Sequence, residues 1–213
     1  RDEGKDVIVF DDMVRTGTPM WGERGQQEGA KRDRYDMIAG NMMMYGIDLS
    51  AYMTYDDIAC TDYIATLPYV DPKRIGCMGF SMGGYRSWLL AALSDKIKTA
   101  VSVCWMVTTQ EQMSFKYSRT ENGGFANCFP GLRRWLDYPH IASLACPKPM
   151  LFISGTKDKL FPINGANKAF SIMHKVWDSQ GADNNLQTEM WDIPHSFGKP
   201  VQRRALEFFK EHL

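Results

Sequence analysis

Short apolar runs alternate with longer amphipathic stretches along most of this chain of 213 residues. The short runs are rich in β-branched residues and have the length of buried strands, and the longer stretches carry apolar residues at helical spacing. The alternation predicts an α/β fold with a mostly parallel sheet, helices on both faces and right-handed crossovers. The predicted strands are 7–10, 74–79, 99–105, 149–154 and 187–193, and the predicted helices are roughly 52–67, 82–94, 165–180 and 200–212.

One segment, about 106–147, breaks this alternation. It separates two predicted strands and is too long for an ordinary connection. It is rich in aromatic residues and contains a Gly-Gly break. A long aromatic insertion between strand ends is typical of a lid or a pocket wall, and the alternative is a structural excursion that covers a sheet edge. We therefore expect a single α/β domain over 1–213 with an insertion at 106–147.

Composition narrows the classes of function. Lys and Arg number 25, as do Asp and Glu, and this balance argues against a protein that grips nucleic acid through its phosphates. No run approaches the length of a membrane-spanning helix, so we expect no membrane partner. The five cysteines contain no CxxC spacing, so neither a zinc site nor a disulfide framework is indicated, although a single disulfide stays open.

The strongest chemical motif is Gly79-Phe80-Ser81-Met82-Gly83, which has the pattern G-x-S-x-G. It stands between a predicted strand and a predicted helix, the setting that a nucleophile elbow requires. The glycines permit a sharp turn that lifts the Ser81 hydroxyl above the sheet. The N–H of Met82, at the helix N-terminus, could stabilise an oxyanion. The alternative is a glycine-rich turn without catalysis.

A serine nucleophile needs a positioned base, and His195 is the favoured candidate. It directly follows the predicted strand 187–193. That position places it at a carboxyl-terminal strand end, where ligands meet open α/β sheets. The other histidines are expected in a loop (His140), within a helix (His174) and at the C-terminus (His212). His140 is the minor alternative.

The base in turn needs an acidic orienting residue, and Asp158 is the favoured candidate. It follows the predicted strand 149–154, and the order Ser81, Asp158, His195 is the one expected of an α/β-hydrolase. Asp192 is the main rival. It lies in the strand leading to His195, so its carboxylate should project from the sheet instead of reaching the imidazole.

Several segments together resemble the α/β-hydrolases related to acetyl xylan esterases and dienelactone hydrolases. The resemblance covers nearly the whole chain and is strongest at 70–84, 95–105, 155–162 and 194–197. It implies that Ser81, Asp158 and His195 form a catalytic triad. It also implies an esterase that needs no metal or organic cofactor, with an acetylated carbohydrate as a candidate substrate. We assign Trp105 and Phe161 to the substrate pocket.

The resemblance also raises an expectation about the N-terminus. The sequence begins at what looks like the fourth strand of these enzymes, without the earlier loop that supplies the second oxyanion N–H. We therefore expect residues upstream of Arg1 to carry the missing strands, and the resemblance mildly favours an exported enzyme.

Two rival functions stay open at this point. A serine peptidase of the prolyl-oligopeptidase type uses the same elbow and triad. A non-catalytic binding module could share the fold, because one fold hosts many functions.

Overall fold

The computed structural model describes residues 34–114, 117 and 127–213. The chain divides into two compact units, one formed by 1–50 with 120–128 and the other by 51–119 with 129–213. The predicted strand at 7–10 lies outside the described residues. The elements in chain order are α2 (Arg34–Met44), α3 (Leu49–Ile64), β1 (Ile75–Phe80), α4 (Met82–Leu93), β2 (Ile97–Val103), α5 (Thr109–Gln112), η1 (Leu132–Arg134), α6 (Tyr138–Ala142), η2 (Ser143–Ala145), β3 (Met150–Gly155), α7 (Ile163–Ser179), η3 (Asp183–Asn185), β4 (Leu186–Trp191) and α8 (Lys199–His212).

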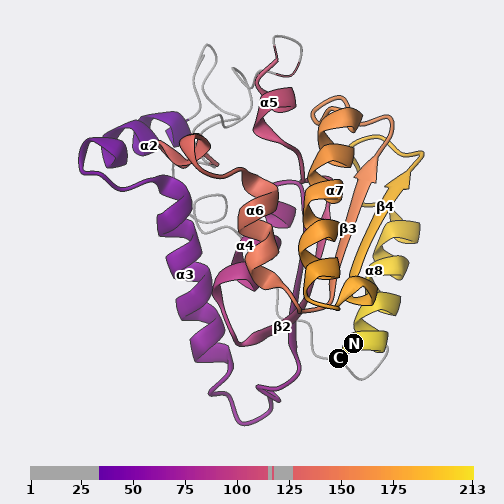
Figure 1. The fold of residues 1–213 in the computed structure, drawn as a ribbon. Coiled ribbons are helices and arrows are strands. Elements are labelled where there is room, and N and C mark those ends of the chain that lie inside the picture. The colour runs from indigo at the N-terminus through magenta and orange to yellow at the C-terminus, as the bar shows by residue number, and fades with distance from the viewer. Residues whose placement is uncertain (1–33, 115–116, 118–126) are drawn as a thin grey trace. The chain divides into compact units, whose positions relative to one another are not determined.

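The second unit is built on a parallel sheet with the strand order β1-β2-β3-β4 (Figure 1). Its register pairs Met78 with Val101 and Ser102 with Phe152. All three pairings are parallel, so the carboxyl ends of the four strands share one edge. Each of these strands lies within two residues of its predicted bounds, and the predicted α/β fold is confirmed.

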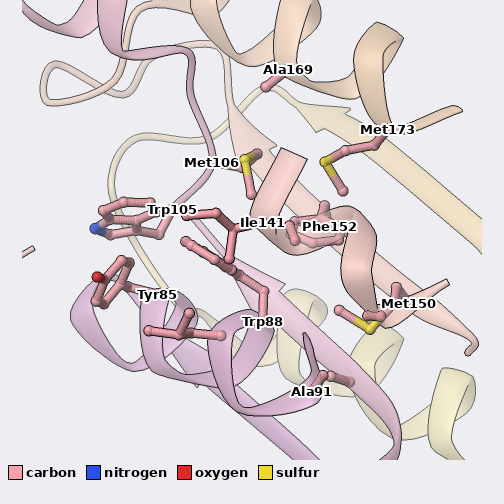
Figure 2. Packing of buried hydrophobic residues seen from close by; sticks show 14 of the residues in the cluster. Tyr85, Trp88, Ala91, Trp105, Met106, Ile141, Met150, Phe152, Ala169 and Met173 are labelled. Carbon is pink, nitrogen blue, oxygen red and sulfur yellow. The ribbon is translucent and has the colours of Figure 1, made fainter. Parts of the chain in front are cut away.

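Alternate side chains of the central strands enter two different cores. Met150 and Phe152 of β3 pack with residues of α4, α6 and α7 on one face (Figure 2). Leu151 and Ile153 of the same strand pack with residues of α8 on the other face. A fully buried apolar side chain of this size contributes about 1.5–3 kcal/mol, so both faces stabilise the sheet. This two-sided burial explains why the strands read as continuous apolar runs.

The predicted helices correspond to α3, α4, α7 and α8, with two differences. Helix α3 ends at Ile64, earlier than the predicted 67. The chain then turns, with Thr66 N–H donating to the Tyr63 carbonyl at 3.0 Å. Helix α2 was not predicted, because its sequence has only weak apolar periodicity.

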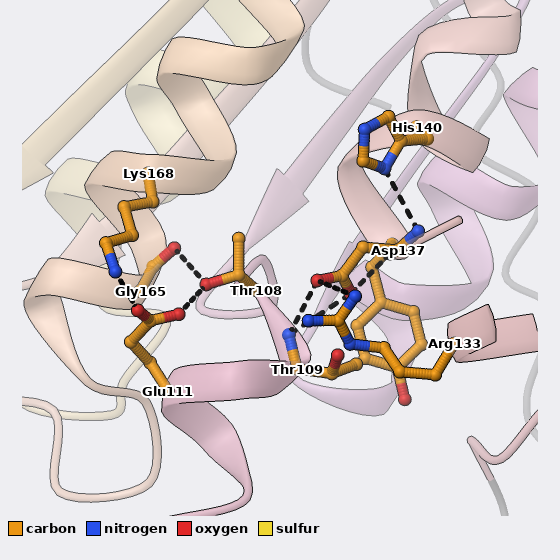
Figure 3. A network of polar contacts seen from close by, with 9 residues as sticks. Thr108, Thr109, Glu111, Arg133, Asp137, His140, Gly165 and Lys168 are labelled. Carbon is orange, nitrogen blue, oxygen red and sulfur yellow. Dashed lines mark hydrogen bonds and ion pairs between the residues drawn. The ribbon is translucent and has the colours of Figure 1, made fainter. Parts of the chain in front are cut away.

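The described part of the insertion 106–147 contains short helices: α5, η1, α6 and η2. His140 lies within α6, so its predicted place in a loop is wrong. A polar network centred on Asp137 links the starts of α5 and α6 (Figure 3). The lid role of the insertion stays a prediction.

All five cysteines are free thiols, so the single disulfide that the sequence allowed is not formed. Among the described residues, no helix combines the length and the apolar character needed to span a bilayer.

Candidate active site

Ser81 occupies a strained turn between β1 and α4. Its backbone angles are φ 55° and ψ −120°, a conformation that costs a residue with a side chain about 1–3 kcal/mol. Two hydrogen bonds hold it: Ser81 N–H donates to the Val103 carbonyl at 2.9 Å, and Tyr85 N–H donates to the Ser81 carbonyl at 3.0 Å. Such strain is typical of functional turns, and it matches the predicted elbow geometry.

The glycines of the motif allow this turn because they let two backbones come close. A Cβ atom on Gly79 would lie 2.1 Å from the carbonyl carbon of Gly83. A Cβ atom on Gly84 would lie 2.9 Å from the Val103 carbonyl oxygen. Helix α4 therefore begins directly against the strand ends. Met82 is its first residue, and an N–H in the first turn has no partner within its own helix.

Asp158 and His195 come together at the same edge of the sheet, from the loops that follow β3 and β4. The Oδ2 atom of Asp158 lies 2.7 Å from Nδ1 of His195. The other carboxylate oxygen accepts a hydrogen bond from Leu160 N–H at 2.8 Å. The carboxylate is 1% exposed and the imidazole 20%, so the ring is the more accessible partner. With Nδ1 as the donor, Nε2 is left as a proton acceptor.

A glycine lets these two loops meet. A Cβ atom on Gly155, the last residue of β3, would lie 2.3 Å from the Ile193 carbonyl oxygen. Two backbone bonds join the loops: Thr156 N–H to the Trp191 carbonyl at 2.8 Å and Lys157 N–H to the Ile193 carbonyl at 3.1 Å. Gly155 is not among the predicted site residues, although its place directly before the Asp158 turn was a usable signal.

Asp192, the rival acid, is engaged elsewhere. Strand β4 ends at Trp191, so Asp192 stands one residue beyond the strand instead of within it. Its carboxylate is 75% exposed and bonds Lys157 Nζ at 2.7 Å and Thr156 Oγ1 at 3.1 Å. The hydrogen bond from Lys157, with a further one from Thr156, lowers the pKa of Asp192.

Two phenylalanine rings contact the His195 imidazole. The Phe80 ring, directly before Ser81, lies 4.6 Å from it between centroids. The Phe161 ring stacks on it at 5.9 Å with an interplanar angle of 15°. Trp105 contacts Phe161 edge-on at 5.7 Å. Both predicted pocket residues are nearly buried, and Trp105 belongs to the core beside Tyr85 (Figure 2). Their pocket role stays a prediction.

Cys104, the residue after β2, also reaches this pair. Its thiol is buried, and the Cys104 Sγ, one Asp158 oxygen and one His195 nitrogen all lie within 4.8 Å of one another. These three atoms form a donor set that could hold a metal ion. Burial raises the pKa of Cys104 to about 11, so the thiol is protonated near neutral pH. From the sequence, Cys104 is one of several residues of the predicted strand 99–105, and nothing local marks it as a neighbour of the pair.

The remaining histidines have other partners. His140 Nδ1 accepts a hydrogen bond from Asp137 N–H at 3.0 Å, and His174 Nε2 lies 2.9 Å from Thr188 Oγ1. His212 lies against the Phe208 ring at 4.4 Å. Of the four, His195 alone has a ring nitrogen at hydrogen-bond distance from a carboxylate in the described part of the chain.

Comparison with known proteins identifies the family. The sequence pattern of the prolyl oligopeptidase family matches residues 48–213, which include the elbow and the Asp158–His195 pair. "Putative hydrolase YtaP" of Bacillus subtilis (strain 168) is 29% identical over 194 residues, or 91% of this chain, and the chain spans 62% of that relative's length.

Solved structures agree on the fold. A carbohydrate esterase family 15 glucuronoyl esterase from Caldicellulosiruptor kristjansonii superposes with a TM-score of 0.61 at 16% identity, over 76% of this chain and 49% of that one. A "putative acetyl xylan esterase" from Bacteroides fragilis NCTC 9343 gives 0.61 at 19% identity, over 78% and 41%. The α/β-hydrolase resemblance is thus confirmed at the level of fold, and the family match over 48–213 decides the assignment: the chain belongs to the prolyl oligopeptidase family.

Proposed function

We propose that this chain is the catalytic part of a serine carboxylic-ester hydrolase, with Ser81 as nucleophile, His195 as base and Asp158 as its orienting acid. The observation that carries the proposal is the 2.7 Å contact between Asp158 and His195, at the sheet edge where Ser81 occupies a strained turn. A nucleophile, a base and a third group that orients the base are the elements that covalent hydrolysis needs.

The reaction would proceed through an acyl-enzyme. His195 Nε2 takes the proton of Ser81 as its oxygen bonds to the carbonyl carbon of the ester. The Met82 N–H donates to the oxyanion, an interaction worth roughly 2.7–4 kcal/mol per donor in such enzymes. His195 then protonates the leaving alcohol and activates a water molecule that releases the acid. Asp158 keeps the imidazole in the required tautomer throughout.

Acetylated carbohydrate is the substrate class that we favour. The support is a likeness in fold to solved structures whose names include glucuronoyl and acetyl xylan esterases. Because a shared fold leaves the substrate open, this part of the proposal needs its own test.

A prolyl-specific serine peptidase is the second candidate, and the family match favours it. Both reactions use the same triad and differ in the bond that is cleaved. Rates on acetylated xylo-oligosaccharides and on p-nitrophenyl acetate, compared with those on prolyl p-nitroanilides, separate them. A preference for prolyl amides would replace the ester proposal with the peptidase one.

Labelling with a fluorophosphonate probe tests whether Ser81 is the nucleophile. The wild-type chain should be labelled at Ser81, and Ser81→Ala should abolish labelling and lower kcat by about 10⁴–10⁶-fold. Ser87, a buried α4 serine whose hydroxyl donates to the Gly83 carbonyl at 2.7 Å, offers the matched control Ser87→Ala. An unlabelled wild-type chain would mark a non-catalytic module instead.

A further inference from the structure

We propose that Cys104 is a positioning residue for the His195–Asp158 pair. Its thiol holds the loop that carries His195 and packs against the Asp158 carboxylate. The inference rests on the proposed function for its catalytic consequence. It is argued from one structural observation: the end of β2 meets the loops that follow β3 and β4.

The contacts of the thiol support this role. Cys104 Sγ donates to the carbonyl oxygen of Ser196, the residue after His195, at 3.9 Å. The same sulfur lies within 4.8 Å of a carboxylate oxygen of Asp158 and a ring nitrogen of His195. Cys104 is 1% exposed, so this contact is made inside the protein and not across solvent. The thiol therefore touches both loops whose separation fixes the acid–base geometry.

The backbone at Cys104 carries the second argument. Its φ is +52°, a left-handed conformation that glycine adopts freely and a residue with a side chain does not. The Cys104 N–H donates to the Ile153 carbonyl at 2.7 Å, which holds the turn against β3. Ser81 is the other non-glycine residue with positive φ among the described residues. Both strained residues stand directly after a strand, at the edge where the pair lies.

The protonation state of the thiol defines what it can contribute. The pKa of Cys104 is raised to about 11, chiefly by burial and further by the neighbouring Asp158 charge. A protonated thiol is a weak neutral donor, not a second anion beside the carboxylate. Among the described residues, Asp158 and Cys104 are acidic groups gathered at His195, while Phe80 and Phe161 face its ring as uncharged neighbours. Cys104 thus acts through geometry and does not compete with Ser81 as a nucleophile.

Three variants of the full chain separate positioning from stability. Cys104→Ala and Cys104→Gly both remove the thiol, but only glycine relieves the positive φ. Cys104→Ser keeps a donor for the Ser196 carbonyl. Cys77→Ala is the matched control, because Cys77 is another internal thiol, whose Sγ bonds the Ser87 carbonyl at 3.3 Å. For each we would measure kcat and KM on p-nitrophenyl acetate, the thermal midpoint, and the NMR signal of the His195 Nδ1 proton.

We expect Cys104→Ala and Cys104→Gly to lower kcat alike, by roughly 10- to 100-fold, with KM within about twofold. The NMR signal of the His195 Nδ1 proton should move upfield in both, because a displaced carboxylate forms a weaker hydrogen bond with it. The glycine variant should unfold at a higher temperature than the alanine variant, and Cys104→Ser should regain part of kcat. Cys77→Ala should keep the wild-type kcat and the wild-type signal of the His195 Nδ1 proton.

Two results would overturn the inference. One is a Cys104→Gly variant with wild-type kcat and a wild-type signal of the His195 Nδ1 proton. The other is activity that follows thermal stability across the variants, which would indicate a packing role alone. If the wild-type chain cleaves no ester or amide, the proposed function fails, but the NMR signal of the His195 Nδ1 proton still decides whether Cys104 positions the pair.

Discussion

Two buried aspartates in this protein each lie beside a histidine, and their carboxylates have different partners. Asp158 stands in the loop after β3 and faces Nδ1 of His195 with its carboxylate. Asp137 precedes α6, where its carboxylate accepts the N–H groups of Thr109 and Tyr138. The histidine of this second region, His140, accepts a hydrogen bond from the Asp137 backbone N–H, and its ring is not paired with the Asp137 carboxylate (Figure 3).

The difference lies in which atoms meet. In the Asp137 region both side chains cap a helix in a reciprocal box, so the histidine ring is an acceptor at Nδ1 and serves the backbone. In the Asp158 region the carboxylate accepts from the ring itself, so Nε2 is left as the acceptor for another group. Burial and proximity to a histidine are therefore insufficient to identify a catalytic acid. The pairing of carboxylate with imidazole is the distinguishing feature.

The comparison predicts its largest difference in kcat for substitutions of the two histidines. His195→Gln should lower kcat by about 10⁴–10⁶-fold, since it removes the proposed base. His140→Gln should leave kcat within about twofold, because that ring serves a helix cap. Steady-state kinetics on p-nitrophenyl acetate measure both. Equal losses from the two substitutions would remove the distinction between the regions.

Substitutions of the two aspartates should affect different properties, catalytic activity for Asp158 and stability for Asp137. Asp158→Asn should lower kcat by about 10⁴-fold, because an amide favours the wrong imidazole tautomer. Asp137→Asn should leave kcat of the folded protein within about threefold but lower the free energy of unfolding by about 1–3 kcal/mol, since the buried N–H of Thr109 loses a charged acceptor. Kinetics and urea unfolding at pH 7 check the pair. A large kcat loss in Asp137→Asn would mean that the α5–α6 region acts on the site.

The smallest expected effect is a loss of stability at alkaline pH that comes from Cys77. Burial raises the pKa of Cys77 from 9.0 to about 12, so the folded state prefers the protonated thiol. This contribution is complete below pH 9 and is lost as the pH rises toward 12, at up to about 1.4 kcal/mol per pH unit. Urea unfolding at pH 8 and pH 10 should show a smaller alkaline loss in Cys77→Ala than in the wild type. Parallel losses in both proteins would show that Cys77 is not the source.

The sequence by itself determined the sheet and the candidates for the site. A short apolar run such as Met150–Gly155, flanked by amphipathic stretches, predicts a strand that is buried on both faces. The pattern at Gly79–Gly83 predicted the turn at Ser81, because glycine spacing and a strand–helix boundary are both local features. A place directly after a predicted strand favoured His195, and such a place together with chain order favoured Asp158.

Only the tertiary structure decided which residues of different loops lie against one another. The sequence could not place Gly155 against Ile193 or Cys104 beside Asp158, because these contacts join residues 38 and 54 positions apart in the chain. Nor could it show that the Asp192 carboxylate is bound by Lys157 and Thr156, or that His140 caps a helix. Local periodicity reports which face of an element is apolar, whereas the pairing of loops depends on how the strands align, and that alignment is set by packing across the whole sheet.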